Sequence, residues 1–98
     1  MLKHFHQQNK RMSIQYRNRI LEINPDAILW DDMDDCIIGI TEEARVVYDI
    51  HKMELKIMEL KNFSFEDASD WVEFNMLRTY LGNFTPVHVW TMPDEMID

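Results

Sequence analysis

The sequence has few of the small residues on which several catalytic motifs depend. Its 98 residues include only two glycines, Gly39 and Gly82, and three serines. Isolated glycines exclude a Walker-type phosphate loop and a dinucleotide-binding fingerprint, and no serine stands between two glycines as a nucleophile elbow requires. The single cysteine, Cys36, excludes an internal disulfide bond and a zinc site made of several cysteines. We therefore favour a protein that is not an enzyme and has no catalytic residue, metal site or cofactor.

Long apolar runs are also missing. No stretch reaches the roughly 18 consecutive apolar residues that a membrane-spanning helix needs. Residues 1–11 also lack the apolar core of a signal peptide. A lone cysteine without an export signal is typical of a reducing compartment. The sequence therefore predicts a cytoplasmic protein without a membrane partner.

Positive charge is scarce beyond the first few residues. The chain has 18 acidic and 10 basic side chains, a formal net charge of −8. Lys3, Lys10 and Arg11 lie within residues 1–11, which contain no acid, so the rest of the chain has a net charge of −11. A surface this negative repels nucleic acid and anionic membranes. We expect it to attract a basic protein, although such charge also serves solubility alone.

Hydrophobic residues make up 46% of the chain, which is enough for one core. We expect a flexible leader at residues 1–12, a single α+β domain at residues 13–92 and an acidic tail at residues 93–98. The periodicity within the domain predicts the order α-β-β-α-α-β. Its elements are a helix from Ser13 to the Asn24-Pro25 pair, strands at 36–40 and 45–48, helices at 50–61 and 65–81, and a strand at 87–92. This order predicts a three-stranded antiparallel sheet with two to three helices packed on one side.

Polar residues mark the ends of both long helices. Asp49 is placed to cap the helix at 50–61, and Ser64 is placed to cap the helix at 65–81. Gly82 then supplies the left-handed position that ends the second of these helices. Asn75 on that helix is predicted to be buried, with its amide bonded to the backbone of a nearby loop.

The predicted helix at 65–81 is apolar on two faces. One face holds Phe65, Ala68, Val72 and Met76, and the other holds Phe74, Leu77 and Leu81. A helix with two apolar faces must be covered on both. The sheet can cover one, whereas the N-terminal helix or a second subunit must cover the other. A homodimer through the face of Phe74, Leu77 and Leu81, or a homo-oligomeric structural protein, is therefore an alternative.

Four aspartates occur within five residues, at Asp31, Asp32, Asp34 and Asp35. Adjacent like charges disfavour a packed element, so the pattern predicts an exposed loop. Three interpretations stay open: a solvated loop, a contact for a basic partner, or a site for a hard cation, which prefers carboxylate oxygens. The third would make the protein a small divalent-metal-dependent enzyme, although the spaced ligands and the glycine of an EF-hand are missing.

A second group of acids, Glu66, Asp67, Asp70 and Glu73, lies in the first turns of a predicted helix. The positive end of the helix dipole favours acidic residues at these positions, so a purely structural role would explain them. Together with the aspartates they could also form a negative surface that fills a nucleic-acid-binding groove, with carboxylates in place of phosphates. We expect both groups to contact the partner, with Trp90 as an exposed aromatic anchor.

Several segments resemble a family of small uncharacterised proteins encoded by tailed phages and prophages. The matching residues are Asp34-Asp35-Cys36-Ile37-Ile38-Gly39-Ile40, Tyr48-Asp49 with Lys52, Glu73-Phe74-Asn75, and Tyr80-Leu81-Gly82 followed by Thr85-Pro86. Together they cover most of residues 26–90, whereas residues 1–11 depart from the family's short leader. The resemblance implies a phage origin, a small α+β fold and, by analogy, a host-directed or anti-defence role. The expected function is therefore that of an acidic accessory protein that binds a basic host protein in the host cytoplasm.

Overall fold

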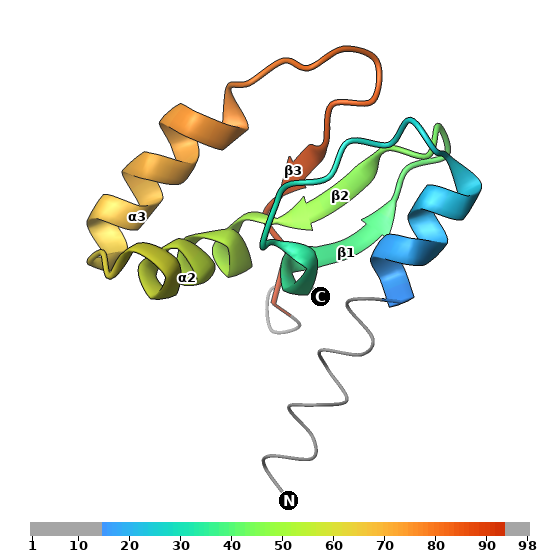
Figure 1. The fold of residues 1–98 in the computed structure, drawn as a ribbon. Helices are drawn as coiled ribbons and strands as arrows, with labels where there is room; N and C mark the ends of the chain where they lie inside the picture. The colour runs from blue at the N-terminus through green and yellow to red at the C-terminus, as the bar shows by residue number, and fades with distance from the viewer. Residues whose placement is uncertain (1–14, 94–98) are drawn as a thin grey trace, which may run out of the picture.

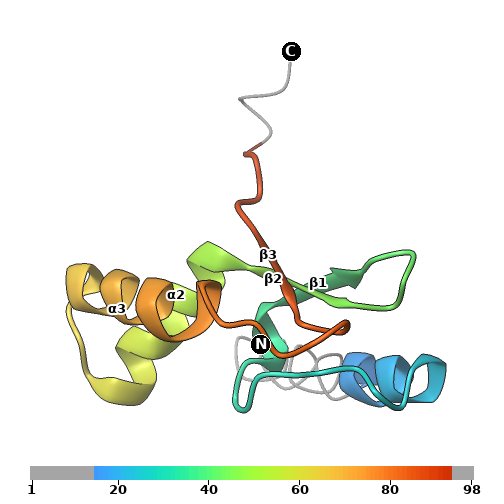
Figure 2. The same cartoon turned by 90° about the horizontal axis from the view of Figure 1, so that it is seen from above.

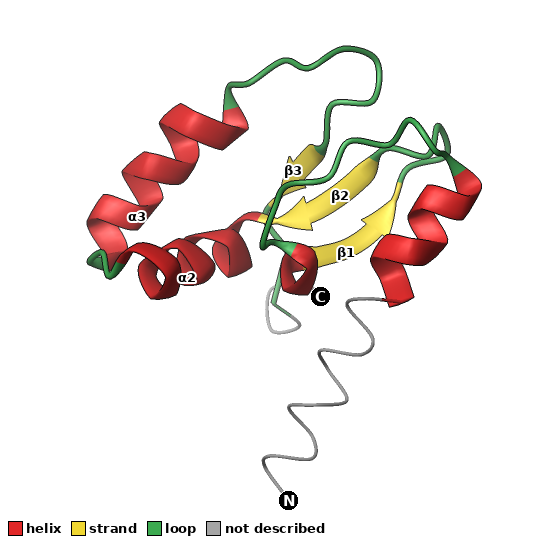
Figure 3. Cartoon of the chain, viewed as in Figure 1, coloured by secondary structure: helices red, strands yellow, loops and turns green. Residues whose placement is uncertain are grey.

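The structure is a computed structural model that describes residues 15–93 (Figures 1 and 3). The predicted leader, the predicted cap Ser13 and residues 94–98 lie outside the described part. The described chain contains, in order, a helix over residues 15–23, a 3₁₀ turn at Asp34–Cys36, β1 (Ile37–Ile40), β2 (Val46–Asp49), α2 (Ile50–Lys61), α3 (Phe65–Val72), a π-helical segment at Glu73–Leu77 and β3 (Val87–Val89). This order confirms the predicted α+β class.

The sheet is mixed, which corrects the expectation of a purely antiparallel one. The strand order is β1-β2-β3, with β1 antiparallel and β3 parallel to β2. The helices α2 and α3 run in opposite directions (Figure 1), so by themselves they would bring the chain back to the end of β2. A strand that started there would run antiparallel to β2. Residues 78–86 instead carry the chain back along the sheet, so that Val87 pairs beside Val47 and Val89 beside Asp49 (Figure 1).

The helices occupy two places around the sheet. Figure 2 shows the helix of residues 15–23 and the connection that follows it on one side of the sheet, below it in this view, while α2 and α3 lie beside the sheet. The buried core runs through both regions. Its members are Ile20, Met33, Cys36, Ile37, Val46, Tyr48, Met53, Ile57, Ala68, Val72 and Met76. The core therefore joins the helix pair to the sheet through β2 and the start of α2.

The predicted caps of α2 and α3 are confirmed. The Asp49 side chain accepts a hydrogen bond from the Lys52 N–H at 3.1 Å, and the Ser64 hydroxyl accepts one from the Asp67 N–H at 3.2 Å. Between the two helices Asn62 adopts a left-handed conformation with φ 56°. The short polar side chain of asparagine tolerates this conformation better than most residues do. Local sequence therefore sets the sharp reversal between α2 and α3.

The helix predicted to reach Leu81 ends earlier. The α-helix stops at Val72, continues as a π-helical segment to Leu77, and leaves Leu81 outside the helix. The Thr85 side chain fixes the chain beyond it, since its hydroxyl accepts from the Leu81 N–H at 2.7 Å and donates to the Gly82 carbonyl at 2.6 Å. Gly82, with φ 101°, therefore serves a turn and not a helix end.

The last strand is also shorter than predicted, ending at Val89 instead of Met92. Beyond it the Thr91 hydroxyl donates to Asp49 Oδ2 at 2.6 Å, so a side-chain bond holds this part of the chain in place of strand pairing. Burial alone would raise the pKa of Asp49, but the bonds from Thr91 and the Lys52 N–H outweigh it and lower that pKa. Asp49 thus fastens both α2 and the end of β3.

Replacing Asp49 with alanine removes the cap of α2 and the partner of Thr91 together. Loss of a helix N-cap costs roughly 1–2 kcal/mol, and a hydrogen bond contributes about 1 kcal/mol. We expect the free energy of unfolding of Asp49→Ala to fall by about 2–3 kcal/mol in chemical denaturation. Thr91→Val keeps the cap and should lose only about 1 kcal/mol. Equal losses in the two variants would contradict a capping role for Asp49.

Candidate protein-binding surfaces

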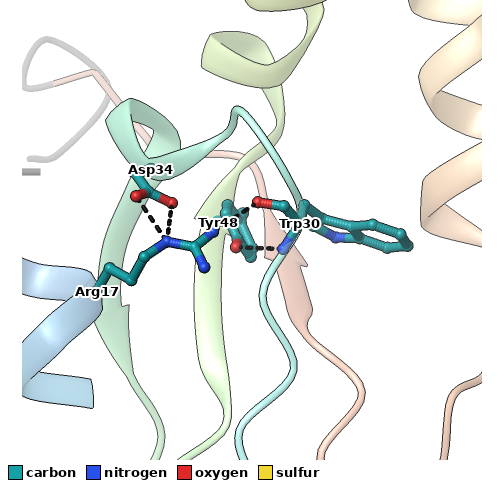
Figure 4. A network of polar contacts seen from close by, with 4 residues as sticks. All are labelled: Arg17, Trp30, Asp34 and Tyr48. Carbon is teal, nitrogen blue, oxygen red and sulfur yellow. Dashed lines mark hydrogen bonds and ion pairs between the residues drawn. The ribbon is translucent and has the colours of Figure 1, made fainter. Parts of the chain in front are cut away.

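A polar network fixes residues 17–34 over the sheet (Figure 4). The hydroxyl of Tyr48, a fully buried residue of β2, accepts a hydrogen bond from the Trp30 N–H at 2.8 Å. Arg17 donates to the Trp30 carbonyl at 3.2 Å and, through Nε, to Asp34 Oδ2 at 2.7 Å. The bond to Asp34 raises the pKa of Arg17. The helix of residues 15–23 is therefore joined to the sheet by one continuous set of bonds.

His88 extends this network into β3. Its ring stacks on Tyr48 with centroids 6.1 Å apart, and its Nε2 accepts a hydrogen bond from Trp30 Nε1 at 2.9 Å. Burial, and to a lesser extent the charge of Arg45, lowers the pKa of His88. Its neutral form is thus favoured, and only this form leaves Nε2 free to accept a bond. The arrangement gives His88 a structural role.

The buried groups with raised pKa values are poor candidates for catalysis. Burial raises the pKa of the Cys36 thiol to about 12 and that of the Tyr48 hydroxyl to about 12. A nucleophilic cysteine needs the opposite shift, because only the thiolate attacks. Cys36 lies at the end of the 3₁₀ turn, with its sulfur 3.8 Å from that of Met33. It behaves as a small apolar side chain of the core.

The structure divides the first acidic group. Asp34 is bonded to Arg17, and Asp35 forms an ion pair with Lys56 of α2 at 3.3 Å. Asp31 and Asp32 are exposed in the turn before them, so the predicted loop is in part a short 3₁₀ turn. Among residues 15–93, no three histidine, cysteine or acidic side chains gather as a metal site. The divalent-metal alternative therefore gains no support from this cluster.

The second acidic group lies on α3 and its continuation. Glu66, Asp67 and Asp70 are exposed, and within residues 15–93 none of their carboxylates forms an ion pair. Glu73 does form one, with Arg78 at 2.8 Å. The two acidic groups belong to different elements, each of which contacts α2. We call Glu66, Asp67 and Asp70 the α3 acids below.

Exposed aromatic side chains accompany the acids at one of the two groups. Phe74 is 65% exposed in the π-helical segment, with the Arg78 guanidinium 5.3 Å from its ring centre. Trp90 is 61% exposed as predicted, but it follows β3 and does not lie on an element that carries either acidic group. Phe65 precedes the α3 acids and Phe74 follows them, and Phe74 is the more exposed of the two, at 65% against 46%.

The apolar side chains of the predicted helix at 65–81 follow a different division from the expected one. Ala68, Val72 and Met76 are buried as predicted, whereas Phe65 is exposed. Of the second face only Leu77 packs against the core; Phe74 and Leu81 are exposed. The π-helical segment and the early helix end separate these residues, so they do not form one continuous helical face.

Three features of the structure were not anticipated. The buried asparagine is Asn24, whose amide donates to the Ala44 carbonyl at 3.2 Å; Asn75 is exposed and bonds to Trp71 one turn earlier. The Glu54 side chain is buried on α2, with Oε1 unbonded except for His51 Nδ1 at 3.5 Å. A groove between residues 15–23 and β1 is the third. The stretch Ile37-Ile38-Gly39-Ile40, predicted as a strand, is the part of the sequence that borders this groove.

Comparison of the chain with protein-family models, curated proteins and solved structures gave no match. Two residues of the segments from which a resemblance to phage proteins was predicted have structural roles in this fold: Asp49 caps a helix and Thr85 fixes a turn. No helix in residues 15–93 is both long and apolar enough to cross a membrane. The functional inference therefore rests on the surfaces described above.

The lowered pKa of His88 gives the protein a defined pH dependence. The unfolded chain binds a proton at this residue near its usual pKa of 6.5, whereas the folded protein does so only at lower pH. The free energy of unfolding should therefore fall as the pH drops below about 6.5, until the folded pKa is passed. The glutamine side chain of His88→Gln can still accept the hydrogen bond from Trp30 Nε1, but it does not titrate. The fall in the free energy of unfolding that is due to His88 should therefore be absent from this variant. Urea unfolding at about pH 7.5 and about pH 5.5 measures it; an unchanged slope in the variant would refute the assignment.

Proposed function

We propose that the protein is a non-enzymatic binding protein that attaches to a basic host protein through the exposed acidic face of α3. The observation that supports it is that the three α3 acids are exposed, form no ion pair with any residue of 15–93, and lie in the chain between two exposed aromatic residues, Phe65 and Phe74. Protein interfaces commonly combine an aromatic anchor with a polar rim. The resemblance to phage proteins supports a host protein as the target, and with it a host-takeover or anti-defence role.

Helix geometry brings two of the α3 acids onto one surface. Asp67 and Asp70 are spaced at i and i+3 on α3, which is the spacing of one helix face, and Phe74 follows in the π-helical segment. Asp67 and Asp70 rise about 4.5 Å apart along the axis. Consecutive phosphates of a DNA strand rise roughly 3.4 Å. A partner whose groove normally binds nucleic acid would thus meet carboxylates at a comparable spacing, and this supports nucleic-acid mimicry as the mode of binding.

The remaining charge of the protein supports attraction over a distance. Residues 15–93 contain seven basic and fifteen acidic side chains, and four of the basic ones are already engaged in ion pairs with acids. The surplus is negative and includes the exposed Asp31 and Asp32. Such a field accelerates the encounter with a basic partner and weakens as salt screens it.

The decisive experiment identifies the partner and then removes the α3 acids. A variant with Glu66→Gln, Asp67→Asn and Asp70→Asn removes three charges and keeps the size of the side chains. Binding of the partner captured from host lysate, measured by surface plasmon resonance, should show an association rate constant lower by about tenfold or more. Phe74→Ser should mainly raise the dissociation rate constant, since it removes the anchor.

A matched control removes the same number of charges elsewhere. The variant Asp26→Asn, Glu42→Gln and Glu43→Gln alters exposed acids outside both proposed groups. It should keep most of the wild-type association rate. If the association rate constant fell equally in the two triple variants, net charge alone would explain the attraction, and a specific α3 surface would be refuted. A partner released by excess duplex DNA would support mimicry, and a partner that retains its DNA while bound would contradict it.

A further inference from the structure

An exposed apolar groove of about 470 Å³ lies between the helix of residues 15–23 and the edge strand β1. Figure 1 shows these two elements side by side. Four of its lining side chains, Tyr16, Ile23, Ile38 and Ile40, are between 40% and 50% exposed. Grouped apolar side chains of this kind typically mark a place where another chain binds.

The groove has the opposite charge to the rest of the protein. Its lining includes Arg19 and Lys52 and no acidic side chain, although residues 15–93 have a net charge of −8. The pair between Arg19 and Glu22, at 3.3 Å, is exposed on both sides and contributes little. The Lys52 side chain forms no ion pair with any described residue. A segment that combines apolar and acidic residues therefore fits the groove.

The sequence contains such a segment just beyond the described residues. Residues 94–98 read Asp-Glu-Met-Ile-Asp, with two apolar side chains, Met96 and Ile97, between acidic ones. Residues 1–11 instead have a net charge of +3, which Arg19 and Lys52 would repel. Charge therefore favours residues 94–98 over residues 1–11 as the segment that binds in the groove. Five extended residues span roughly 17 Å, longer than the roughly 13 Å of the four-residue strand β1 that borders the groove.

The direction of the chain points to a second molecule as the source of this segment. Figure 2 shows the chain after β3 leaving the sheet on the side away from the helix of residues 15–23, which forms one wall of the groove. Trp90 and Met92, on this departing stretch, are 61% and 55% exposed. The described chain therefore leads away from its own groove as it approaches residues 94–98, which is the condition for reciprocal exchange of this segment in a two-fold dimer.

We propose that residues 94–98 of one copy bind in the groove between residues 15–23 and β1 of a second copy. Met96 and Ile97 lie against the exposed isoleucines, and the flanking carboxylates pair with Arg19 and Lys52. This surface is separate from the α3 acids, so dimer formation and binding of the basic partner are tested independently.

Paramagnetic relaxation in a mixed sample tests the exchange. A nitroxide is attached to full-length Pro93→Cys protein, which keeps every residue of 94–98 and in which Cys36 is buried and has a raised pKa, and this protein is mixed with ¹⁵N-labelled wild-type protein. The amide signals of Ile38, Gly39 and Ile40 of the wild-type chains should broaden. A second sample, in which only the nitroxide-bearing protein is ¹⁵N-labelled and is diluted into unlabelled wild-type protein, reports broadening within one molecule. Groove signals that broaden only in this second sample, or in neither sample, overturn the proposal.

Variants provide the second arm. Ile97→Ser should raise the dimer dissociation constant, measured by analytical ultracentrifugation, by roughly tenfold or more, because the apolar contact of a buried isoleucine is lost. Ile38→Ser in the groove should act in the same direction. Leu60→Ser removes an equally exposed apolar side chain of α2 outside the groove and serves as the control. A wild-type protein that stays monomeric at millimolar concentration, or a control as damaging as Ile97→Ser, refutes the exchange.

Discussion

The bond between the Tyr48 hydroxyl and the Trp30 N–H is the constraint on which most of the described structure depends. Tyr48 is fully buried in the central strand, so its hydroxyl needs a partner inside the protein. Trp30 supplies that partner and also bonds to Arg17 through its carbonyl and to His88 through its indole N–H. One residue of the connection thus holds the N-terminal helix, β2 and β3 in fixed relation. The walls of the groove beside β1 depend on the same bonds.

Pairing within the fold decides which of the many acids are available to a partner. Asp34, Asp35 and Glu73 face arginine or lysine side chains and contribute to the structure. Glu66 and Asp67 lie in the first turn of α3, where the helix dipole favours negative charge, so they need no cation to be stable there, and Asp70 is exposed one turn later. Because these three carboxylates form no ion pair with any residue of 15–93, they are open to a basic surface. The groove beside β1, which is lined by Arg19 and Lys52, favours an acidic segment instead.

The sequence predicted what is decided locally and missed what is decided at a distance. The bounds of α2 and the caps Asp49 and Ser64 follow from side chains three residues from their partners, and the structure confirms them. The parallel pairing of β3 could not be predicted, because it depends on how residues 78–86 cross the sheet. The ion pair of Asp34 with Arg17, 17 residues away, was hidden for the same reason. Four adjacent aspartates therefore looked like one site when two of them are structural.

Hydrogen exchange at the Trp30 amide tests this organisation most directly. Trp30 lies outside any helix or strand, so an unbonded amide there would exchange at the rate of an open loop. Because this N–H donates to a fully buried hydroxyl, we expect it to exchange in wild-type protein as slowly as the amides of β2, and much faster in Tyr48→Phe. Rapid exchange of the Trp30 amide in the wild-type protein, or equal rates in the two proteins, would contradict the central role of Tyr48.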